Sequence, residues 1–165
     1  MIVYLVGMPG AGKTVVGREL AGRLGVPFVD LDTEIEREQG RPVTEIFEAE
    51  GEAAFRALEA AALVKAGTQD PSVVSCGGGV VLEPANRITL RNTGTAVYLD
   101  VPIDLLRERV QPAQDRPLVR HEGDLDRLLA ERGSLYREFA AHVVDGSGDP
   151  GEVADAIVEE LRWSV

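Results

Sequence analysis

Cysteine, lysine and aromatic residues are scarce in this chain of 165 residues. The one cysteine, Cys76, cannot form a disulfide within the chain, and this favours a reducing compartment such as the cytoplasm. Lysine occurs only at positions 13 and 65, and the formal net charge is −11. Because proteins that bind nucleic acid usually carry a basic face, we expect no nucleic-acid partner.

Long hydrophobic runs are absent as well. No apolar stretch reaches the roughly 20 residues that a membrane-spanning helix needs, so we expect no membrane partner. The chain opens directly on a short apolar run, so we expect no signal peptide. The length is typical of a single domain, 1–165, and the few aromatics predict a core of Val, Leu, Ile and Ala.

Acidic residues are concentrated between Asp30 and Glu59. Most of these glutamates fit a solvated helix surface. If the substrates are anions, the counter-charge must come from a few placed cationic side chains and a metal ion, because the overall charge is unfavourable. No apolar heptad pattern is visible, so we expect a monomer.

The segment 7–14 fits the pattern G-x-x-x-x-G-K-[ST] of a phosphate-binding loop, or P-loop. Glycines allow the backbone to wrap around a polyphosphate and to aim its N–H groups inward. Lys13 is expected to reach the β- and γ-phosphates, and the Thr14 hydroxyl to bind Mg²⁺. The helix that follows presents the positive end of its dipole to the same phosphates.

The surroundings of this motif support it. Residues 2–6 form a short apolar run, which is typical of a buried parallel strand. After the motif, Val16, Leu20 and Leu24 recur every four positions, and Gly25 is placed to end a helix. A strand, a loop and a helix in this order favour a P-loop over a chance glycine turn.

Strands and helices are predicted to alternate along the chain. Further strands are expected at 27–32, 72–75, 95–100 and 142–145. Further helices are expected at 34–39, 43–65 with a break near Gly51, 84–90, 103–110, 124–141 and 151–162. This alternation predicts an α/β fold with a parallel sheet covered on both faces. In such sheets, ligands bind beyond the carboxyl ends of the strands, where the P-loop falls.

Asp30 and Asp32 end the second expected strand. Alternation along an extended segment would point both carboxylates to one side. They could hold Mg²⁺, accept a proton from a substrate hydroxyl, or divide these tasks. The alternative is structural, because Asp32 or Thr33 could cap the helix that begins at Glu34.

Gly77, Gly78 and Gly79 follow the third expected strand. Three consecutive glycines exceed what a turn needs and indicate close approach of the backbone to a ligand. Cys76 precedes them and has no evident basic partner, so we expect a small buried side chain rather than a nucleophile.

Arginines mark the remaining candidate segments. Arg56 and Glu59 can form an ion pair on an expected helix, either as a surface pair or to hold Arg56 for a substrate carboxylate. Arg116 lies in the irregular stretch 111–123, a candidate lid that closes over the phosphates and excludes water. Arg137 follows Tyr136 on the helix expected at 124–141.

Together, these segments resemble the shikimate kinase family over nearly the whole chain. A P-loop alone is unspecific, but six segments in this order and spacing are specific. The resemblance rests on the P-loop followed by Val16-Gly17-Arg18, Asp30-Leu31-Asp32, the segment 55–59, the three glycines, Arg116-Pro117-Leu118 and Leu135-Tyr136-Arg137.

The resemblance implies a three-layer, nucleoside-monophosphate-kinase-like fold with a five-stranded parallel sheet of order 2-3-1-4-5. It implies transfer of the γ-phosphoryl group of ATP to the 3-hydroxyl of shikimate, in aromatic amino-acid biosynthesis, with Mg²⁺ as cofactor. The substrate-binding region is expected at about 32–60 and the lid at about 111–123.

The same resemblance implies roles for individual residues, with Asp32 as the base and Arg56 and Arg137 on the carboxylate of shikimate. The catalytic residues would be Lys13, Asp32 and Arg116. ATP would be bound by Gly10, Ala11, Gly12, Lys13, Thr14, Val15, Arg109, Arg116 and Pro150. Shikimate would be bound by Asp32, Arg56, Gly77, Gly78, Gly79 and Arg137. The metal would be bound by Thr14 directly and by Asp30 through water.

Three other functions fit parts of the pattern. Another small-molecule kinase of this fold, such as a gluconate or nucleoside monophosphate kinase, shares the P-loop but not the combination of three glycines with Leu-Tyr-Arg. A GTP-binding switch would need an Asn-Lys-x-Asp segment, and neither Asn86 nor Asn92 is followed by lysine. A non-catalytic ATP-binding module would not need the complete set of residues assigned to catalysis.

Overall fold

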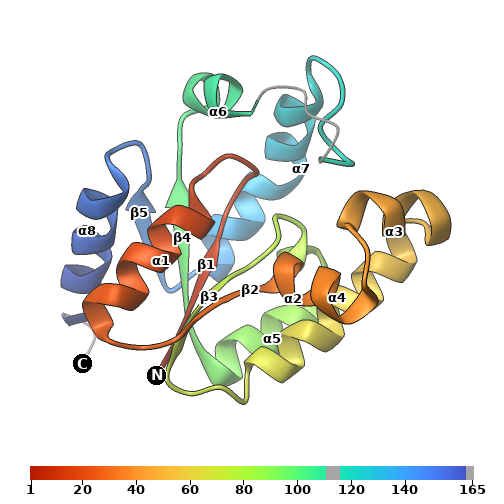
Figure 1. Ribbon diagram of the computed structural model, residues 1–165. Helices are drawn as coiled ribbons and strands as arrows, with labels where there is room; N and C mark the ends of the chain where they lie inside the picture. Colours follow the sequence, from red (N-terminus) through yellow and green to blue (C-terminus); the bar gives the residue numbers. More distant parts are fainter. Residues whose placement is uncertain (111–115, 163–165) are drawn as a thin grey trace.

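A five-stranded sheet forms the centre of the computed structural model, which describes residues 1–110 and 116–162 (Figure 1). All neighbouring strands are parallel and follow the order β2-β3-β1-β4-β5. The sheet order implied by the family resemblance is therefore confirmed. The strands are β1 (Ile2–Val6), β2 (Phe28–Asp30), β3 (Ser72–Ser75), β4 (Gly94–Asp100) and β5 (His142–Asp145).

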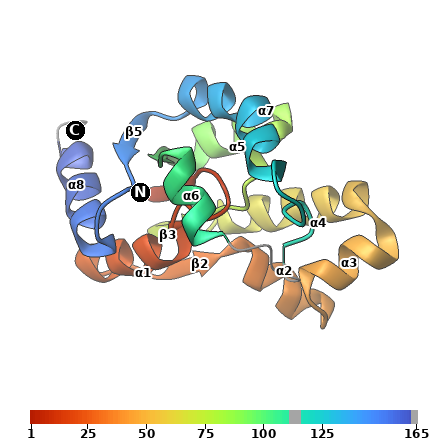
Figure 2. The same cartoon turned by 90° about the horizontal axis from the view of Figure 1, so that it is seen from above.

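Helices cover both faces of this sheet, which confirms the predicted α/β fold (Figure 2). On one face, α1 (Lys13–Leu24) packs against α8 (Pro150–Arg162). On the other, α5 (Pro84–Thr93) and α7 (Asp124–Phe139) pack against β4. The remaining helical elements are α2 (Leu31–Gln39), α3 (Val43–Glu50), α4 (Glu52–Ala66), α6 (Ile103–Arg109) and the 3₁₀ turn η1 (Val80–Leu82).

The central strands are buried because helices lie on each side of them. Every residue of β1 is apolar or aromatic and at most 2% exposed. Because both faces of a central parallel strand are covered, its sequence is apolar throughout and does not alternate between apolar and polar residues. Tyr4, Tyr98 and Tyr136 are the largest buried side chains of a core that is otherwise mainly aliphatic. Within the two described ranges, no helix combines the length and the apolar character needed to cross a membrane.

Most predicted elements are present, with small shifts at their ends. Gly25 follows the last residue of α1 with a left-handed φ of 66°, and Gly51 separates α3 from α4, both as predicted. The helix predicted at 84–90 continues to Thr93, and the one predicted at 124–141 ends at Phe139. Residues 116–123 contain no helix or strand, as predicted. The first part of the predicted lid, 111–115, lies outside the described residues.

The second strand is shorter than predicted, and this changes the geometry of the two acids. β2 ends at Asp30 and α2 begins at Leu31, so Asp32 lies in the first turn of a helix rather than on an extended segment. The Asp30 carboxylate accepts a hydrogen bond from the N–H of Thr33 at 3.1 Å and caps α2. The predicted alternation, and the alternative of a cap at Asp32 or Thr33, are both wrong because the cap forms earlier.

Candidate active site

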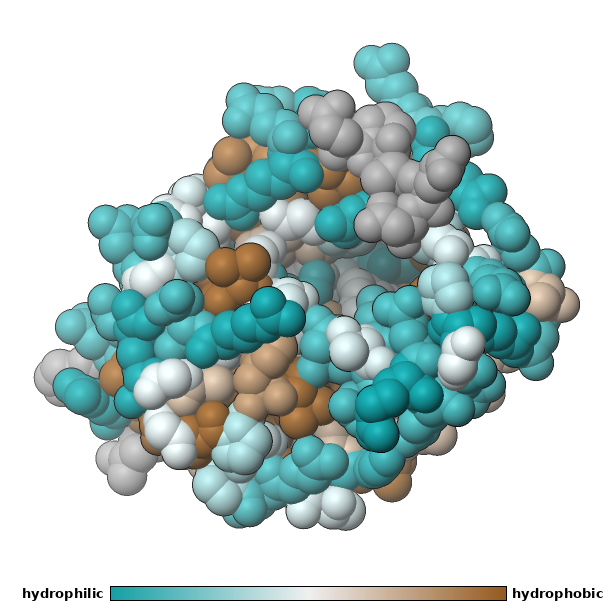
Figure 3. All heavy atoms as spheres, viewed as in Figure 1, coloured by the Kyte–Doolittle hydropathy of each residue, from teal (hydrophilic) through white to brown (hydrophobic). Residues whose placement is uncertain are grey.

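A cavity of about 620 Å³ lies beyond the carboxyl ends of the central strands. Figure 3 shows a hollow on one face of the molecule, with hydrophilic side chains around much of its rim. The P-loop, α2, α4, the segment after β3, residues 116–119 and α7 all contribute to its lining. This is the place where open α/β sheets bind their ligands.

The P-loop connects β1 to α1 and forms one wall of the cavity. Gly12, the residue before α1, has a φ of 90°, a left-handed conformation that suits glycine. The ammonium group of Lys13 donates to the carbonyl oxygens of Gly7 and Met8, at 2.7 and 2.8 Å. The first N–H groups of α1 have no acceptor within the helix, so this wall is suited to an anion.

Thr14, Asp30 and Ser75 form the part of the cavity that suits a metal ion. The Thr14 hydroxyl donates to Asp30 Oδ2 at 2.8 Å, and Asp30 lies in register with Ser75 on β3. No group of three or more His, Cys, Asp or Glu in residues 1–110 and 116–162 could hold a metal. A divalent ion would therefore depend on these hydroxyl and carboxylate oxygens together with phosphates, and Mg²⁺ accepts such a set.

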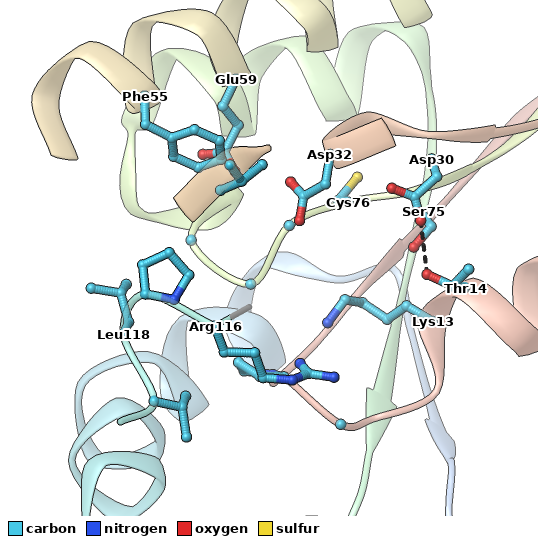
Figure 4. Close-up of a pocket in the computed structure, with 18 of the residues that line it drawn as sticks. Lys13, Thr14, Asp30, Asp32, Phe55, Glu59, Ser75, Cys76, Arg116 and Leu118 are labelled. Atoms are coloured by element: carbon cyan, nitrogen blue, oxygen red, sulfur yellow. Dashed lines mark hydrogen bonds between the residues drawn. The ribbon is translucent and has the colours of Figure 1, made fainter. Parts of the chain in front are cut away.

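Lys13, Asp32 and Arg116 converge on the centre of the cavity from three different segments (Figure 4). Burial raises the pKa of Asp32 to about 6, and the negative charges of Asp30 and Glu59 add to this effect. Burial lowers the pKa of Lys13 to about 8, although the charge of Asp32 opposes this change. At neutral pH the carboxylate can therefore accept a proton while the lysine is still mostly charged.

A group of four charged side chains, Asp32, Arg56, Glu59 and Arg132, lines the same cavity and is called the polar wall here. Arg56 Nη1 donates to Glu59 Oε1 at 3.0 Å, so the predicted ion pair is confirmed. Glu59 is fully buried, Arg132 is only 3% exposed, and burial raises the pKa of Glu59.

Each member of the polar wall keeps one buried polar atom without a hydrogen bond to the described part of the chain. Folded proteins rarely leave such atoms unpaired. We therefore expect a bound ligand to supply the partners. The four atoms are Asp32 Oδ1, Arg56 Nε, Glu59 Oε2 and Arg132 Nε.

The glycine segment (Gly77, Gly78 and Gly79) leaves room for these charged groups. Each of its members lies against a different side chain of the polar wall, and this brings the two guanidinium groups to neighbouring glycines. The close approach predicted from the sequence therefore involves the protein's own side chains. A Cβ would lie 2.7 Å from Glu59 Oε2 at Gly77, 3.3 Å from Arg132 Nη1 at Gly78 and 2.2 Å from Arg56 Nη1 at Gly79.

Apolar side chains complete the cavity. Cys76 also lines it, but its thiol is 2% exposed and burial raises its pKa, so the prediction of a small buried side chain is confirmed. An apolar lining with a few placed charges is typical of a site for a small molecule. The main apolar lining residues are Val43, Phe47, Phe55, Pro117, Leu118, Val119 and Leu128.

The structure does not bring Arg137 to this cavity. Its guanidinium group pairs with Asp100 and lies over the ring of Tyr98, 5.8 Å from the ring centroid. Its side chain is 56% exposed, whereas Arg56, with which it was expected to share a carboxylate, is 13% exposed. The predicted placement of Arg137 beside Arg56 is therefore corrected.

Arg132, which the sequence analysis missed, lies in the cavity instead. It shares the buried face of α7 with Leu128 and Tyr136, four residues before and after it. Arg137 follows Tyr136 by one position and therefore points away from that face. An arginine in register with an apolar stripe is the signal that could have identified this residue.

Among the other predicted site residues, Ala11 and Pro150 do not line the cavity. Ala11 is buried and its N–H donates to the Met8 carbonyl oxygen at 3.1 Å. Pro150 begins α8, and Arg109 reaches the loop before it through the Gly146 carbonyl oxygen at 3.4 Å. The predicted residues that do line the cavity are Gly10, Gly12, Lys13, Thr14, Val15, Asp30, Asp32, Arg56, Gly77, Gly78, Gly79, Arg109 and Arg116.

Sequence comparisons agree with this geometry. Residues 9–162 match the family model described as "Shikimate kinase". The chain is 49% identical over 166 residues to the shikimate kinase of Aromatoleum aromaticum, with 98% of this chain and 95% of that protein covered. It is 46% identical over 164 residues to the shikimate kinase of Halorhodospira halophila, with 97% and 93% covered.

Solved structures give the same result at the level of the fold. The shikimate kinase of Acinetobacter baumannii, in complex with shikimate, matches with a TM-score of 0.95 and 38% identity, covering 99% of this chain and 93% of that chain. The shikimate kinase of Aquifex aeolicus matches with a TM-score of 0.89 and 34% identity, covering 98% and 96%.

Proposed function

Because this chain belongs to the shikimate kinase family, and is therefore an ATP-dependent phosphotransferase, we propose that it transfers the γ-phosphoryl group of ATP to the 3-hydroxyl of shikimate. The observation that carries this proposal is the polar wall, with its four unpaired atoms, in the same cavity as a P-loop. Two guanidinium groups and two carboxylates suit a small acceptor that has one carboxylate and several hydroxyls. The products would be shikimate 3-phosphate and ADP, in aromatic amino-acid biosynthesis.

At the donor end, ATP would lie along the P-loop with its γ-phosphate near Lys13 and Arg116. Phosphoryl transfer depends on positioning and on neutralising charge over the equatorial oxygens, and these two side chains supply that neutralisation. When bound, Mg²⁺ supplies further positive charge, and Thr14 and Asp30 are the residues that would hold it. Arg109 would lie against the adenine ring.

At the acceptor end, Asp32 would orient the 3-hydroxyl and accept its proton, because its pKa of about 6 is close to neutral pH. Arg56 and Arg132 would bind the carboxylate, and the N–H groups of Gly78 and Gly79 would add backbone contacts. The net charge of −11 does not prevent this, since distant charges are screened beyond about 8–10 Å.

The proposal also covers the domain organisation, the cellular location and the partners of the chain. The chain would form a single domain in which 32–60 bind the acceptor and 111–123 form the lid that carries Arg116. It would act as a cytoplasmic monomer without a nucleic-acid or membrane partner.

The first experiment measures ADP release with Mg·ATP and, in turn, shikimate, quinate, gluconate and a set of nucleoside monophosphates. We expect release above background with shikimate alone. Activity with a different acceptor would retain the kinase and discard shikimate. A folded sample that binds ATP but releases no ADP with any acceptor would favour a non-catalytic ATP-binding module.

Arg132 and Arg127, which lie on the same helix α7, give a matched pair for the carboxylate assignment. Lysine keeps the charge but loses the forked geometry, so Arg132→Lys should raise the KM for shikimate by about tenfold or more and leave the KM for ATP within about twofold. Arg127→Lys makes the same change at a side chain that is 59% exposed and does not line the cavity, so both KM values should stay within about twofold. Equal effects of the two variants would remove Arg132 from the acceptor site.

A further inference from the structure

The glycine segment carries two backbone donors that are proposed to bind the acceptor, yet glycine restricts its own backbone less than any other residue. Within residues 1–110 and 116–162, neither the N–H of Gly78 nor that of Gly79 makes a hydrogen bond. Backbone hydrogen bonds hold the two ends of the segment. The N–H of Cys76 donates to the carbonyl oxygen of Leu5 at 3.0 Å, and the N–H of Val80 donates to that of Gly77 at 3.1 Å. The middle needs another restraint.

The side chain of Tyr136 supplies this restraint. Its side chain is fully buried in α7, and its hydroxyl donates to the carbonyl oxygen of Gly78. Among the described residues, no other side chain makes a hydrogen bond to the glycine segment. Burial raises the pKa of Tyr136 to about 12, although the neighbouring Arg132 opposes this, so the hydroxyl stays protonated and remains a donor at neutral pH.

The geometry of the peptide bond transmits the restraint to the cavity. In a planar trans peptide, the carbonyl of Gly78 and the N–H of Gly79 point in opposite directions. Tyr136 does not line the cavity, whereas Gly78 and Gly79 do. Fixing the carbonyl on Tyr136 therefore turns the N–H of Gly79 away from Tyr136, which lies outside the lining, and toward the cavity. One turn earlier, the same helix places Arg132 beside Gly78.

A second layer of side chains holds the Tyr136 ring in place. Tyr98 on β4 stacks on this ring, with centroids 5.1 Å apart and planes inclined by 19°. The Tyr98 hydroxyl donates to Asp100 Oδ1 at 3.4 Å, and Arg137 pairs with Asp100 while lying over Tyr98. Arg137 thus supports Tyr136 from the side remote from the cavity.

We propose that Tyr136 is a positioning residue for the acceptor: its hydroxyl fixes the Gly78–Gly79 peptide so that the N–H of Gly79 faces the ligand, and Arg137, through Asp100 and Tyr98, keeps Tyr136 in place. This inference rests on the proposed function, in which the acceptor is shikimate. It gives the Leu135-Tyr136-Arg137 segment a role in the site without any contact between Arg137 and the substrate.

The test compares Tyr136→Phe with Tyr4→Phe. Both variants remove only a hydroxyl from a buried ring, and the Tyr4 hydroxyl bonds to Thr93 Oγ1 at 2.6 Å beside the start of β4, remote from the cavity. The readouts are KM for each substrate, kcat, the dissociation constant of shikimate measured by calorimetry without nucleotide, and the melting temperature.

We expect Tyr136→Phe to weaken shikimate binding about 3- to 10-fold in both KM and calorimetry, as for one lost hydrogen bond, with the KM for ATP within about twofold. Tyr4→Phe should leave all binding constants unchanged while lowering the melting temperature by a similar amount. The inference is overturned if Tyr136→Phe affects shikimate no more than Tyr4→Phe does, or if it weakens both substrates equally. If the unaltered chain releases no ADP with shikimate, the proposed function fails first and this inference fails with it.

Discussion

Asp32 is a carboxyl group that the fold holds at a cost in stability. The pKa of Asp32 is about 6 in the folded chain, whereas an aspartate exposed to solvent, as in the unfolded chain, has a pKa of 3.8. Burial is the main cause of this increase. Between these two values the folded state binds more protons than the unfolded state. The free energy of unfolding therefore falls as the pH rises through about 4 to 6, so ionised Asp32 destabilises the fold at neutral pH.

Asp32→Asn should consequently separate activity from stability. Loss of the base should lower kcat by about 100-fold or more. The same change should stabilise the fold at pH 8 by at most about 3 kcal/mol, and this gain should shrink toward pH 4. Steady-state kinetics and thermal unfolding at several pH values measure both effects.

Asp104→Asn is the control for this pair of effects, because the Asp104 side chain is 88% exposed. It should change neither kcat nor the pH dependence of stability. Near-normal turnover of Asp32→Asn would remove Asp32 as the base, and an unchanged melting temperature at pH 8 would contradict the raised pKa.

At the scale of single elements, α1 contains two glycines in opposite surroundings. A Cβ on Gly17 would lie 2.5 Å from the ring of Phe28, whereas a Cβ on Gly22 would meet nothing within 4 Å. Gly17 therefore lets α1 pack closely on Phe28, the first residue of β2. Gly22 has no such contact and only weakens the helix.

Alanine should have opposite effects at these two positions. Gly22→Ala should raise the free energy of unfolding by about 0.5–1 kcal/mol, because alanine favours a helix interior. Gly17→Ala should lower it by about 1–3 kcal/mol, since Phe28 or α1 must move. Urea denaturation of both variants measures these changes. If the free energy of unfolding changes in the same direction in both variants, the packing of α1 does not depend on its contact with Phe28.

The accuracy of sequence-based prediction also differs from element to element. β1 and α1 were predictable, because a continuous apolar run and a four-residue repeat each have one simple interpretation. The start of α2 was not predictable from the sequence. The segment Asp30-Leu31-Asp32 is compatible both with a strand that continues to Asp32 and with a helix that is capped by Asp30. Arg132 was missed because its register with Leu128 and Tyr136 places it on the covered face of α7 but does not show that a polar cavity opens there to accommodate its charge.

At the scale of the whole molecule, the cavity is assembled from segments that are remote in sequence. The described part of the predicted lid, 116–123, contacts the acceptor region through an ion pair of Arg120 with Glu48 on α3, at 3.5 Å. Both side chains are exposed, so this pair alone contributes little. Bound ATP and acceptor would add the contacts of Arg116.

Hydrogen exchange in 116–123 should therefore slow when a non-hydrolysable ATP analogue and shikimate are both bound, and more than with either alone. Peptides from α8 on the outer face serve as the reference and should not change. Equal exchange in 116–123 with and without ligands would count against a lid.

The packing of the glycine segment against the polar wall has a consequence for sequence change. Room for a side chain at Gly79 appears only if Arg56 is shortened first, and that shortening removes a group on which acceptor binding is proposed to depend. If Gly79 is replaced first, the new side chain clashes with the guanidinium group of Arg56. Mutational paths through either position therefore cross an inactive intermediate, so the two residues are epistatic and should be retained together or lost together.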